Sequence, residues 1–380
     1  MDDTGLEREP VTSPGLPSWA RALLVVSLLY LFLVGVKLLE SGIKGVGSDY
    51  TDALFEAVSS PLSALFVGVL ATVLVQSSSV TTATIVGLVS AGVVEVDTAV
   101  YMVMGANIGT SVTNTLVSLT HVRRTESFQR AFAAATMHDF FNLIAVAILL
   151  PLQLATGALS SLATWFAGFL PTGAGGSFES PIKAAVSWGS DLVSGAVELV
   201  LGNPVITAVL VAVLGIGIIF FALSLITKNM RVLVAARIET SLNAALARSG
   251  LVGIVVGTIV TIAVQSSSIT TSILVPLAAS GVLLVRNAYP ITLGANIGTT
   301  VTALLAALGA GSIDGLTIAL THTIFNVVAI MLLYPLPRLR YIPVDLAERL
   351  ARIAVRRKSV AITYVVGLFI VVPLVGIFIF

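Results

Sequence analysis

The chain contains no cysteine, which excludes disulfide bonds, thiolate-bound metals and cysteine nucleophiles. It is also poor in charge: 10% of its 380 residues are charged and 57% are hydrophobic, whereas soluble proteins carry roughly 25% charged residues. Such a chain cannot cover its own surface with polar groups, so most of it must be surrounded by a lipid bilayer. The net charge of +1 offers no basic surface for nucleic acid. The composition therefore predicts an all-α polytopic membrane protein.

Sequence motifs of enzymes are absent as well. The chain has no HExxH, GxSxG or P-loop pattern. We therefore expect neither an enzyme nor a bound cofactor, which leaves transport, channel and sensor functions to consider.

What the chain does contain is an internal duplication. At an offset of 189 residues, the motifs that match are VQSSSVTTAT at 75–84 with VQSSSITTSI at 264–273, and GANIGTSVT at 105–113 with GANIGTTVT at 294–302. Further along the offset becomes 184, and HDFFN at 138–142 meets HTIFN at 322–326. Unrelated membrane helices would not carry the same polar motifs in the same order. The chain therefore holds two copies of a unit of about 130 residues.

Several apolar runs reach the ~20 residues that cross a bilayer: 19–38, 97–119, 127–150, 203–226, 288–308, 314–334 and 360–380. The arms beside each QSSS are shorter, at ~15 residues, and suit a re-entrant hairpin with QSSS at its tip. These arms are 61–75 with 80–94, and 250–264 with 269–284. The alternative is one continuous helix through each QSSS. The glycines of GANIG predict that 97–119 and 288–308 are both broken helices.

Basic residues orient the two copies, because cytoplasmic loops are enriched in Lys and Arg. They gather after the run 97–119 and before the second hairpin: Arg123, Arg124 and Arg130, then Lys228, Arg231, Arg237 and Arg248. The segments 39–60 and 309–314 lack such an excess and are expected outside. The copies then point opposite ways, as in the inverted-topology repeats of secondary transporters, whose site lies between the repeats.

These patterns divide the chain into six parts. In order we expect a polar cytoplasmic N-terminal tail 1–18, a first repeat 19–150 with its hairpin at about 61–94, an external connecting loop 151–202, a second repeat 203–335 with its hairpin at about 250–284, a basic cytoplasmic segment 336–359, and a final transmembrane helix 360–380.

The hairpin tips carry groups that bind small ions. A helix that breaks inside a membrane exposes N–H groups at one end and C=O groups at the other, which attract anions and cations respectively. The hairpins contain almost no ionisable residue, so a bound anion would need cations beside it, and oxygen-rich surroundings suit Na⁺. Asp139 is the exception, because it stands midway along an apolar span and is a candidate cation ligand or proton carrier. Its counterpart in the second copy is Thr323.

These residues resemble the type II sodium–phosphate cotransporters. The likeness extends over about residues 25–375 and rests on QSSSVTTATIVGLVSAGVV, MGANIGTSVTNTLVSL, FQRAFAAATMHDFFN and QSSSITTSILVPLAASGVL. It implies a symporter that imports inorganic phosphate with Na⁺ by alternating access, binding both with its two QSSS stretches. It also implies that Asp139 serves an additional Na⁺ in electrogenic members, and that Asn142 and Thr115 contribute to sodium sites.

On this basis we assign the site residues. The expected phosphate ligands are Gln76, Ser77, Ser78, Ser79, Gln265, Ser266, Ser267, Ser268, Asn107 and Asn296. The expected sodium ligands are Ser78, Thr81, Thr110, Thr115, Asp139, Asn142, Ser267, Thr270, Thr299 and Asn326. The lack of glycosylation sequons and cysteines favours a prokaryotic inner membrane. The alternatives are Na⁺-coupled transport of arsenate, sulfate or a dicarboxylate and, in a different class, a channel or a phosphate sensor.

Overall fold

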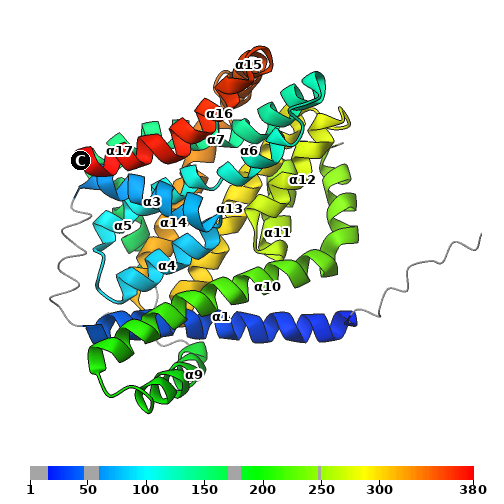
Figure 1. The fold of residues 1–380 in the computed structure, drawn as a ribbon. Coiled ribbons are helices and arrows are strands. Elements are labelled where there is room, and N and C mark those ends of the chain that lie inside the picture. The colour runs from blue at the N-terminus through cyan, green and yellow to red at the C-terminus, as the bar shows by residue number, and fades with distance from the viewer. Residues whose placement is uncertain (1–15, 47–59, 170–180, 247–249) are drawn as a thin grey trace, which may run out of the picture.

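The computed structural model describes residues 16–46, 60–169, 181–246 and 250–380, and these are almost entirely helical (Figure 1). Within them six helical segments are long and apolar enough to cross a membrane: α1 (Ser18–Val46), α7 (Thr125–Thr156), the part Pro204–Met230 of α10 (Pro204–Leu246), α13 (Val285–Ala310), α14 (Ile313–Leu333) and Lys358–Ile379. The last segment comprises α16 (Lys358–Val366), the π-helix η1 (Gly367–Val371) and α17 (Val372–Ile379). The all-α class is confirmed, and six of the apolar runs found in the sequence correspond to these segments.

Each QSSS motif interrupts a helix. In the first copy α3 (Pro61–Val75) is followed by α4 (Ser78–Ser90), and in the second copy α11 (Gly250–Val264) is followed by α12 (Ser267–Ala279). The turn is made in the same way twice, because Gln76 and Gln265 both adopt the left-handed conformation at φ 56°. The prediction of two helical arms around each motif is confirmed, and the alternative of one continuous helix is wrong.

Glycines allow α5 (Val96–Gly109) to lie directly against α3, and α13 against α11. A Cβ on Gly105 would lie 1.9 Å from the carbonyl oxygen of Leu65, and one on Gly294 would lie 2.0 Å from that of Ile254. Helices in membranes approach this closely where small residues form the interface. The glycines of GANIG therefore fix how α3 packs on α5 and how α11 packs on α13.

The break predicted at GANIG occurs in one copy only. The run 97–119 is divided into α5, which ends at Gly109, and α6 (Val112–Leu119), as predicted. The helix α13 passes through the second GANIG without interruption, so the prediction of a second broken helix was wrong. Its glycines serve the close contact with α11 while the backbone hydrogen bonds of the helix continue.

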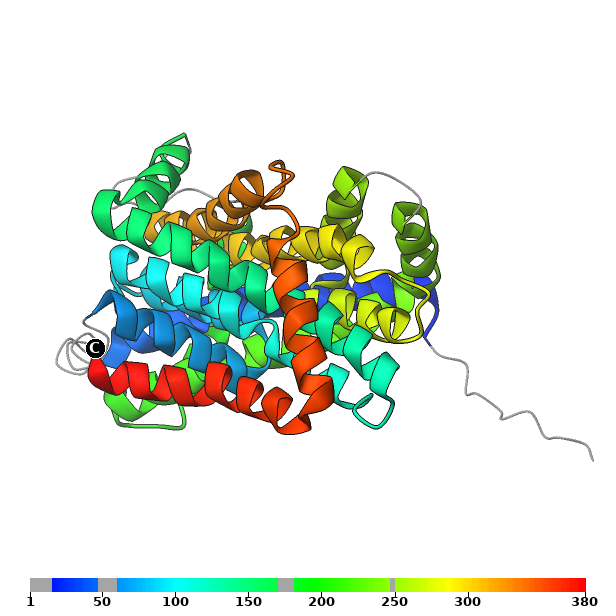
Figure 2. The same cartoon turned by 90° about the horizontal axis from the view of Figure 1, so that it is seen from above.

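The long helices α1 and α10 form another matched pair, because each precedes one of the hairpins. They lie side by side along one edge of the molecule (Figure 1). Gly42 of α1 faces the backbone of Ala212, and Gly215 of α10 faces that of Leu39. The last helix packs against α3 and runs along another side of the bundle in both views (Figure 2).

The segments between and after the repeats are also helical: α8 (Ala158–Ala167), α9 (Pro181–Glu198) and α15 (Ile342–Arg356). The helix α7 continues through Pro151 to Thr156, so the division expected at residue 150 falls inside a helix. Parts of three expected segments lie outside the described residues: 1–15 of the N-terminal tail 1–18, 47–59 of the external segment 39–60, and 170–180 of the connecting loop 151–202.

Candidate functional site

The two QSSS tips meet at one cavity, although they are 189 residues apart in the sequence. The cavity has a volume of about 310 Å³. Its lining comprises Val75, Gln76, Ser77, Ser79 and Val80 from the first tip, Gln265 and Ser266 from the second, and Phe220, Leu223, Ser224 and Thr227 from α10. None of these described residues is ionisable. The cavity thus offers amide and hydroxyl groups from both copies of the repeat, and no fixed charge.

The glutamine at each tip is held by the same pair of hydrogen bonds. The Gln76 amide donates to the carbonyl oxygen of Val73 at 2.6 Å and accepts from the Thr113 hydroxyl at 3.1 Å. Gln265 repeats this with the carbonyl of Ile262 at 2.7 Å and the hydroxyl of Thr302 at 3.0 Å.

The threonine bonds tie the first tip to α6, which follows GANIG, and the second tip to the part of α13 that follows GANIG. The sequence alignment pairs Thr113 with Thr302, but their contact with the tip glutamines was not predicted.

The serines after each glutamine begin a helix. The Ser77 hydroxyl accepts from the Val80 amide at 3.3 Å, and the Ser266 hydroxyl accepts from the Ile269 amide at 3.3 Å. Both serines line the cavity, so the N-termini of α4 and α12 begin at its wall. The free amides and positive dipole of a helix N-terminus favour a negative ligand. The remaining predicted phosphate ligands of the tips, Ser78, Ser267 and Ser268, do not line the cavity.

Four asparagines join the two copies at the centre of the bundle. Asn142 donates to the Asn107 carbonyl at 2.6 Å, Asn296 donates to the Asn142 side chain at 2.9 Å, and Asn326 donates to the Asn107 side chain at 3.2 Å. His138 completes the chain with Asn296 at 2.5 Å. All four asparagines are at most 4% exposed. Asn107 and Asn296, assigned to phosphate from the sequence, therefore belong to this network and not to the wall of the cavity.

Four of the threonines assigned to sodium are buried in the tips or beside the GANIG motifs. The hydroxyl of each donates to the carbonyl four residues earlier: Thr81 to Ser77, Thr110 to Ala106, Thr270 to Ser266 and Thr299 to Ala295. Thr270 also accepts from the Thr261 hydroxyl at 2.9 Å, whereas the hydroxyl oxygens of the other three accept no hydrogen bond from the described residues. Such hydroxyl and carbonyl oxygens are ligands that hard cations accept. Across the described part of the chain there is no group of three acidic, histidine or cysteine side chains that could hold a metal. A cation here would therefore be bound mainly by neutral oxygens.

Asp139 lies fully buried in α7, 0% exposed. Its Oδ2 accepts from the Thr115 hydroxyl at 3.3 Å and from the Tyr364 hydroxyl at 2.9 Å. Its Oδ1 has no hydrogen-bond partner among the residues that the structure covers. Thr115 was predicted as a sodium ligand, but not beside Asp139; Tyr364, from the last helix, was not predicted. Its signal in the sequence is weak, since it is one tyrosine in an otherwise apolar run.

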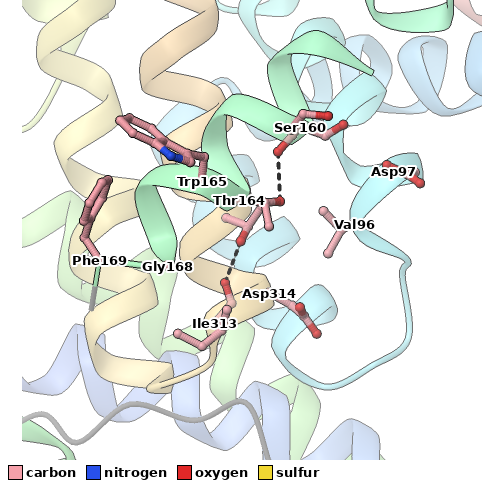
Figure 3. Close-up of a pocket in the computed structure, with 11 residues that line it drawn as sticks. Val96, Asp97, Ser160, Thr164, Trp165, Gly168, Phe169, Ile313 and Asp314 are labelled. Atoms are coloured by element: carbon pink, nitrogen blue, oxygen red, sulfur yellow. Dashed lines mark hydrogen bonds between the residues drawn. The ribbon is translucent and has the colours of Figure 1, made fainter. Parts of the chain in front are cut away.

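A second cavity of about 880 Å³ opens beside α8 (Figure 3). The carboxylates of Asp97 and Asp314 and the rings of Trp165 and Phe169 lie around it (Figure 3). None of the QSSS residues lines it. Two carboxylates would repel an anion, so this cavity suits cations or water and is not the candidate phosphate site.

Comparison with known proteins identifies the family. A family model described as Na⁺/Pi-cotransporter matches residues 31–170 and 218–342. Similar curated proteins include the sodium-dependent phosphate transport proteins 2A of Mus musculus and of Oryctolagus cuniculus, 32% and 33% identical over 92% of this chain. Protein 2B of Homo sapiens is 31% identical over 93% of the chain. No solved structure matches the chain.

The chain therefore belongs to the Na⁺/Pi-cotransporter family, which confirms the resemblance found in the sequence. It is a multi-pass membrane protein, and its family is one of transporters and not of enzymes. The chain spans 66% of the length of the 2A relatives and 64% of the human 2B relative.

Proposed function

We propose that the chain is a symporter that imports inorganic phosphate, driven by the Na⁺ gradient, and that it binds phosphate in the cavity between the two QSSS tips. One observation carries this proposal: both tips line the same cavity, and no described residue of its wall is ionisable. The names of the relatives, which are sodium-dependent phosphate transport proteins, agree with it.

The absence of a fixed charge in this cavity explains the need for Na⁺. Phosphate carries roughly one to two negative charges at neutral pH. Moving an anion out of water costs far more free energy than hydrogen bonds from hydroxyl and amide donors alone recover, unless a positive charge accompanies the anion. The buried oxygens of Thr81 and Thr270, in the hairpin tips, and of Thr110 and Thr299, directly after the GANIG motifs, can hold such cations. We infer that Na⁺ binds first and makes the cavity suitable for phosphate.

The arrangement of the two copies supports inverted repeats with re-entrant hairpins. Phe380, at the end of the last helix, stacks on Phe66 near the start of α3, with ring centroids 6.4 Å apart. At the other hairpin, Tyr334 after α14 lies against Gly250 at the start of α11. By the distribution of basic residues, the contact between Phe380 and Phe66 would lie outside, and the contact between Tyr334 and Gly250 would lie in the cytoplasm. The starts of α3 and α11 would then face opposite sides of the membrane. We infer a cytoplasmic N-terminus, a prokaryotic plasma membrane and alternating access around a site between the repeats.

The residues that carry transport follow from this proposal. Phosphate would contact the tip residues that line the cavity: Gln76, Ser77, Ser79, Gln265 and Ser266. The buried Thr hydroxyls and Asn142 and Asn326 would bind Na⁺ or order its ligands, and Asp139 would hold a further cation.

We expect the affinity for phosphate to fall steeply as Na⁺ is lowered, because cations bound beside the site supply its only positive charge. If one Na⁺ must bind before phosphate, each tenfold decrease in Na⁺ below saturation lowers the affinity for phosphate roughly tenfold. Each further Na⁺ that must bind adds another factor of roughly ten. The measurement is equilibrium binding of labelled phosphate to the purified protein at a series of Na⁺ concentrations, with choline replacing Na⁺. A dissociation constant that does not depend on Na⁺ would contradict the proposal.

The alternative within transport is a different oxyanion. Competition of arsenate, sulfate and a dicarboxylate with labelled phosphate separates these substrates, because hydroxyl donors recognise geometry and charge. Arsenate, which shares the shape and charge of phosphate, should compete best. A channel is distinguished by accumulation, since a channel cannot concentrate phosphate against its gradient.

We expect Asp139→Gly to leave Na⁺-dependent phosphate uptake running while the charge moved per phosphate falls by one. The reason is that Asp139 provides a fully buried carboxylate, which we expect to bind one cation. Without this carboxylate, one cation fewer should move with each phosphate. The matched control is Thr323→Gly at the equivalent position of the second copy, which places glycine in a helix without removing a charge. Current and tracer uptake are measured together. An unchanged charge per phosphate in Asp139→Gly would show that Asp139 does not carry the additional cation.

A further inference from the structure

One residue that departs from the duplication is bonded to the last helix. Asp139 in the first copy is matched by Thr323 in the second, so only one copy has a carboxylate at this position. Tyr364 of α16 donates to Oδ2 of Asp139 at 2.9 Å. The Thr323 hydroxyl donates instead to the Ala319 carbonyl of its own helix at 3.1 Å. The carboxylate that only one copy has is thus bonded to a helix that follows both copies.

The position of the Tyr364 ring is fixed by aromatic neighbours. Phe132 and Phe140 of α7 lie with their ring centroids 6.2 Å from it, and Phe369 lies at 6.5 Å. Phe132 and Phe369 are themselves fully buried. Such edge and tilted contacts hold a ring in place more specifically than aliphatic packing does. Neighbouring residues of α16, such as Ile362 and Val366, are exposed, as expected for a face turned to lipid.

The backbone departs from a regular α-helix just after Tyr364. Residues Gly367–Val371 form the π-helix η1, whose extra residue per turn changes the direction of side chains along the segment. The Gly367 amide is shared between the carbonyl oxygens of Thr363 and Tyr364. Short π-helices occur frequently at functional sites. Here the irregular turn separates the part of the helix that bears Tyr364 from α17, which packs on α3.

The other oxygen of Asp139 is left for a ligand. Oδ1 is buried and has no partner in the described residues. A buried charged oxygen without a partner is costly, so it needs a proton, a water molecule or a cation. The Thr115 hydroxyl, the other donor to Oδ2, is shared with the Ser111 carbonyl at 3.2 Å, which places Ser111 beside the carboxylate. The Ser111 hydroxyl donates to the Ile108 carbonyl at 3.1 Å, so its oxygen can still face a cation. Ser111 stands at the break between α5 and α6.

We propose that Tyr364 is a positioning residue for cation binding: it holds Oδ2 of Asp139 and thereby presents Oδ1, together with Ser111 at the helix break, to the additional Na⁺. This inference rests on the proposed Na⁺ symport and extends it to the last helix. A movement of α16 relative to α7 would release the carboxylate, so the last helix takes part in the binding and release of that ion. Nothing else in the last helix offers a polar side chain to the bundle centre.

The test is Tyr364→Phe, which keeps the ring and removes only the hydroxyl. A hydrogen bond to a charged group contributes enough that its loss should raise the Na⁺ concentration for half-maximal current by about tenfold. At low Na⁺ the charge per phosphate should fall toward the value of Asp139→Gly, and at high Na⁺ it should return to that of the wild type. If Tyr364 contributed only to packing, Tyr364→Phe would lower the amount of active protein. It would leave the Na⁺ concentration for half-maximal current and the charge per phosphate unchanged.

The matched control is Tyr289→Phe. Tyr289 is buried in the bundle, and its hydroxyl has no partner within the described ranges, so removal of that hydroxyl should change neither the Na⁺ dependence nor the charge per phosphate. A double variant adds a second criterion. If Tyr364 acts through Asp139, Tyr364→Phe should have no further effect on current or Na⁺ dependence in the Asp139→Gly background.

Thermal unfolding of the purified protein in NaCl and in choline chloride separates this inference from the proposed function. The Na⁺-dependent rise in the unfolding temperature should shrink in Tyr364→Phe and persist in Tyr289→Phe. If the wild type shows this rise but no Na⁺-driven phosphate uptake, the proposed function fails while the role of Tyr364 stands. If Tyr364→Phe matches the wild type in Na⁺ stabilisation, half-maximal Na⁺ and charge per phosphate, the role of Tyr364 is refuted.

Discussion

Replacing Gln76 or Gln265 with glutamate is expected to abolish phosphate transport. Both side chains line the cavity, where no described residue carries a charge. The change alters few atoms but places a negative charge where phosphate binds. At a separation of about 4 Å and an effective dielectric constant near 20, two like charges repel by about 4 kcal/mol, which lowers affinity by more than about 100-fold. The hydroxyls of Thr113 and Thr302 can still donate to the new carboxylate, so each tip keeps one of its two hydrogen bonds.

The measurement is Na⁺-dependent uptake of labelled phosphate by each variant in proteoliposomes with equal amounts of protein. The control is Gln129→Glu, which makes the same chemical change on α7 at a residue that does not line the cavity. It should transport like the wild type. Near-normal uptake by both Gln76→Glu and Gln265→Glu would mean that phosphate binds elsewhere.

The second large effect is expected on folding. Gly105→Ala and Gly294→Ala each place a Cβ about 2 Å from a backbone carbonyl oxygen of the neighbouring hairpin, at 1.9 and 2.0 Å respectively. Because the obstacle is backbone, no side-chain rotation relieves the contact, and the hairpin must move away. Overpacking of this kind costs roughly 1–3 kcal/mol even where side chains can adjust, and we expect the upper end or more.

The amount of monodisperse protein and its unfolding temperature in detergent report this effect. Gly217→Ala is the control, since a Cβ added to this helical glycine of α10 meets nothing within 4 Å. It should be neutral or slightly stabilising, because alanine favours a helix over glycine. Wild-type stability in both Gly105→Ala and Gly294→Ala would show that the hairpins do not pack as closely as described.

Much of the fold follows from the sequence because its signals are local. QSSS places four polar residues inside an apolar stretch, which predicts an interruption, and both helices end there. The duplication then predicts that the interruption takes the same form in both copies, and Gln76 and Gln265 both adopt the left-handed conformation there. The unbroken α13 shows the limit of such reasoning. Glycine permits both a break and a close contact between helices, and the partner helix, not the motif, decides between them.

The candidate site was predicted less completely, because its contacts join distant parts of the chain. Residues of α10 complete the wall of the cavity, but Phe220, Ser224 and Thr227 stand in an apolar run with no motif. Tyr364 reaches Asp139 across 225 residues. The asparagines were identified as polar residues in both copies, yet only the packing of the copies on each other shows that Asn107 bonds Asn326 and Asn142 bonds Asn296.

An uncharged cavity between two duplicated tips should take phosphate only together with Na⁺. Uptake of labelled phosphate into proteoliposomes measures this, with Na⁺ or K⁺ outside and the membrane potential held at two values. We predict uptake that requires Na⁺, accumulates phosphate against its gradient and increases with an inside-negative potential. Equal uptake in Na⁺ and in K⁺ would show that the cavity does not depend on Na⁺.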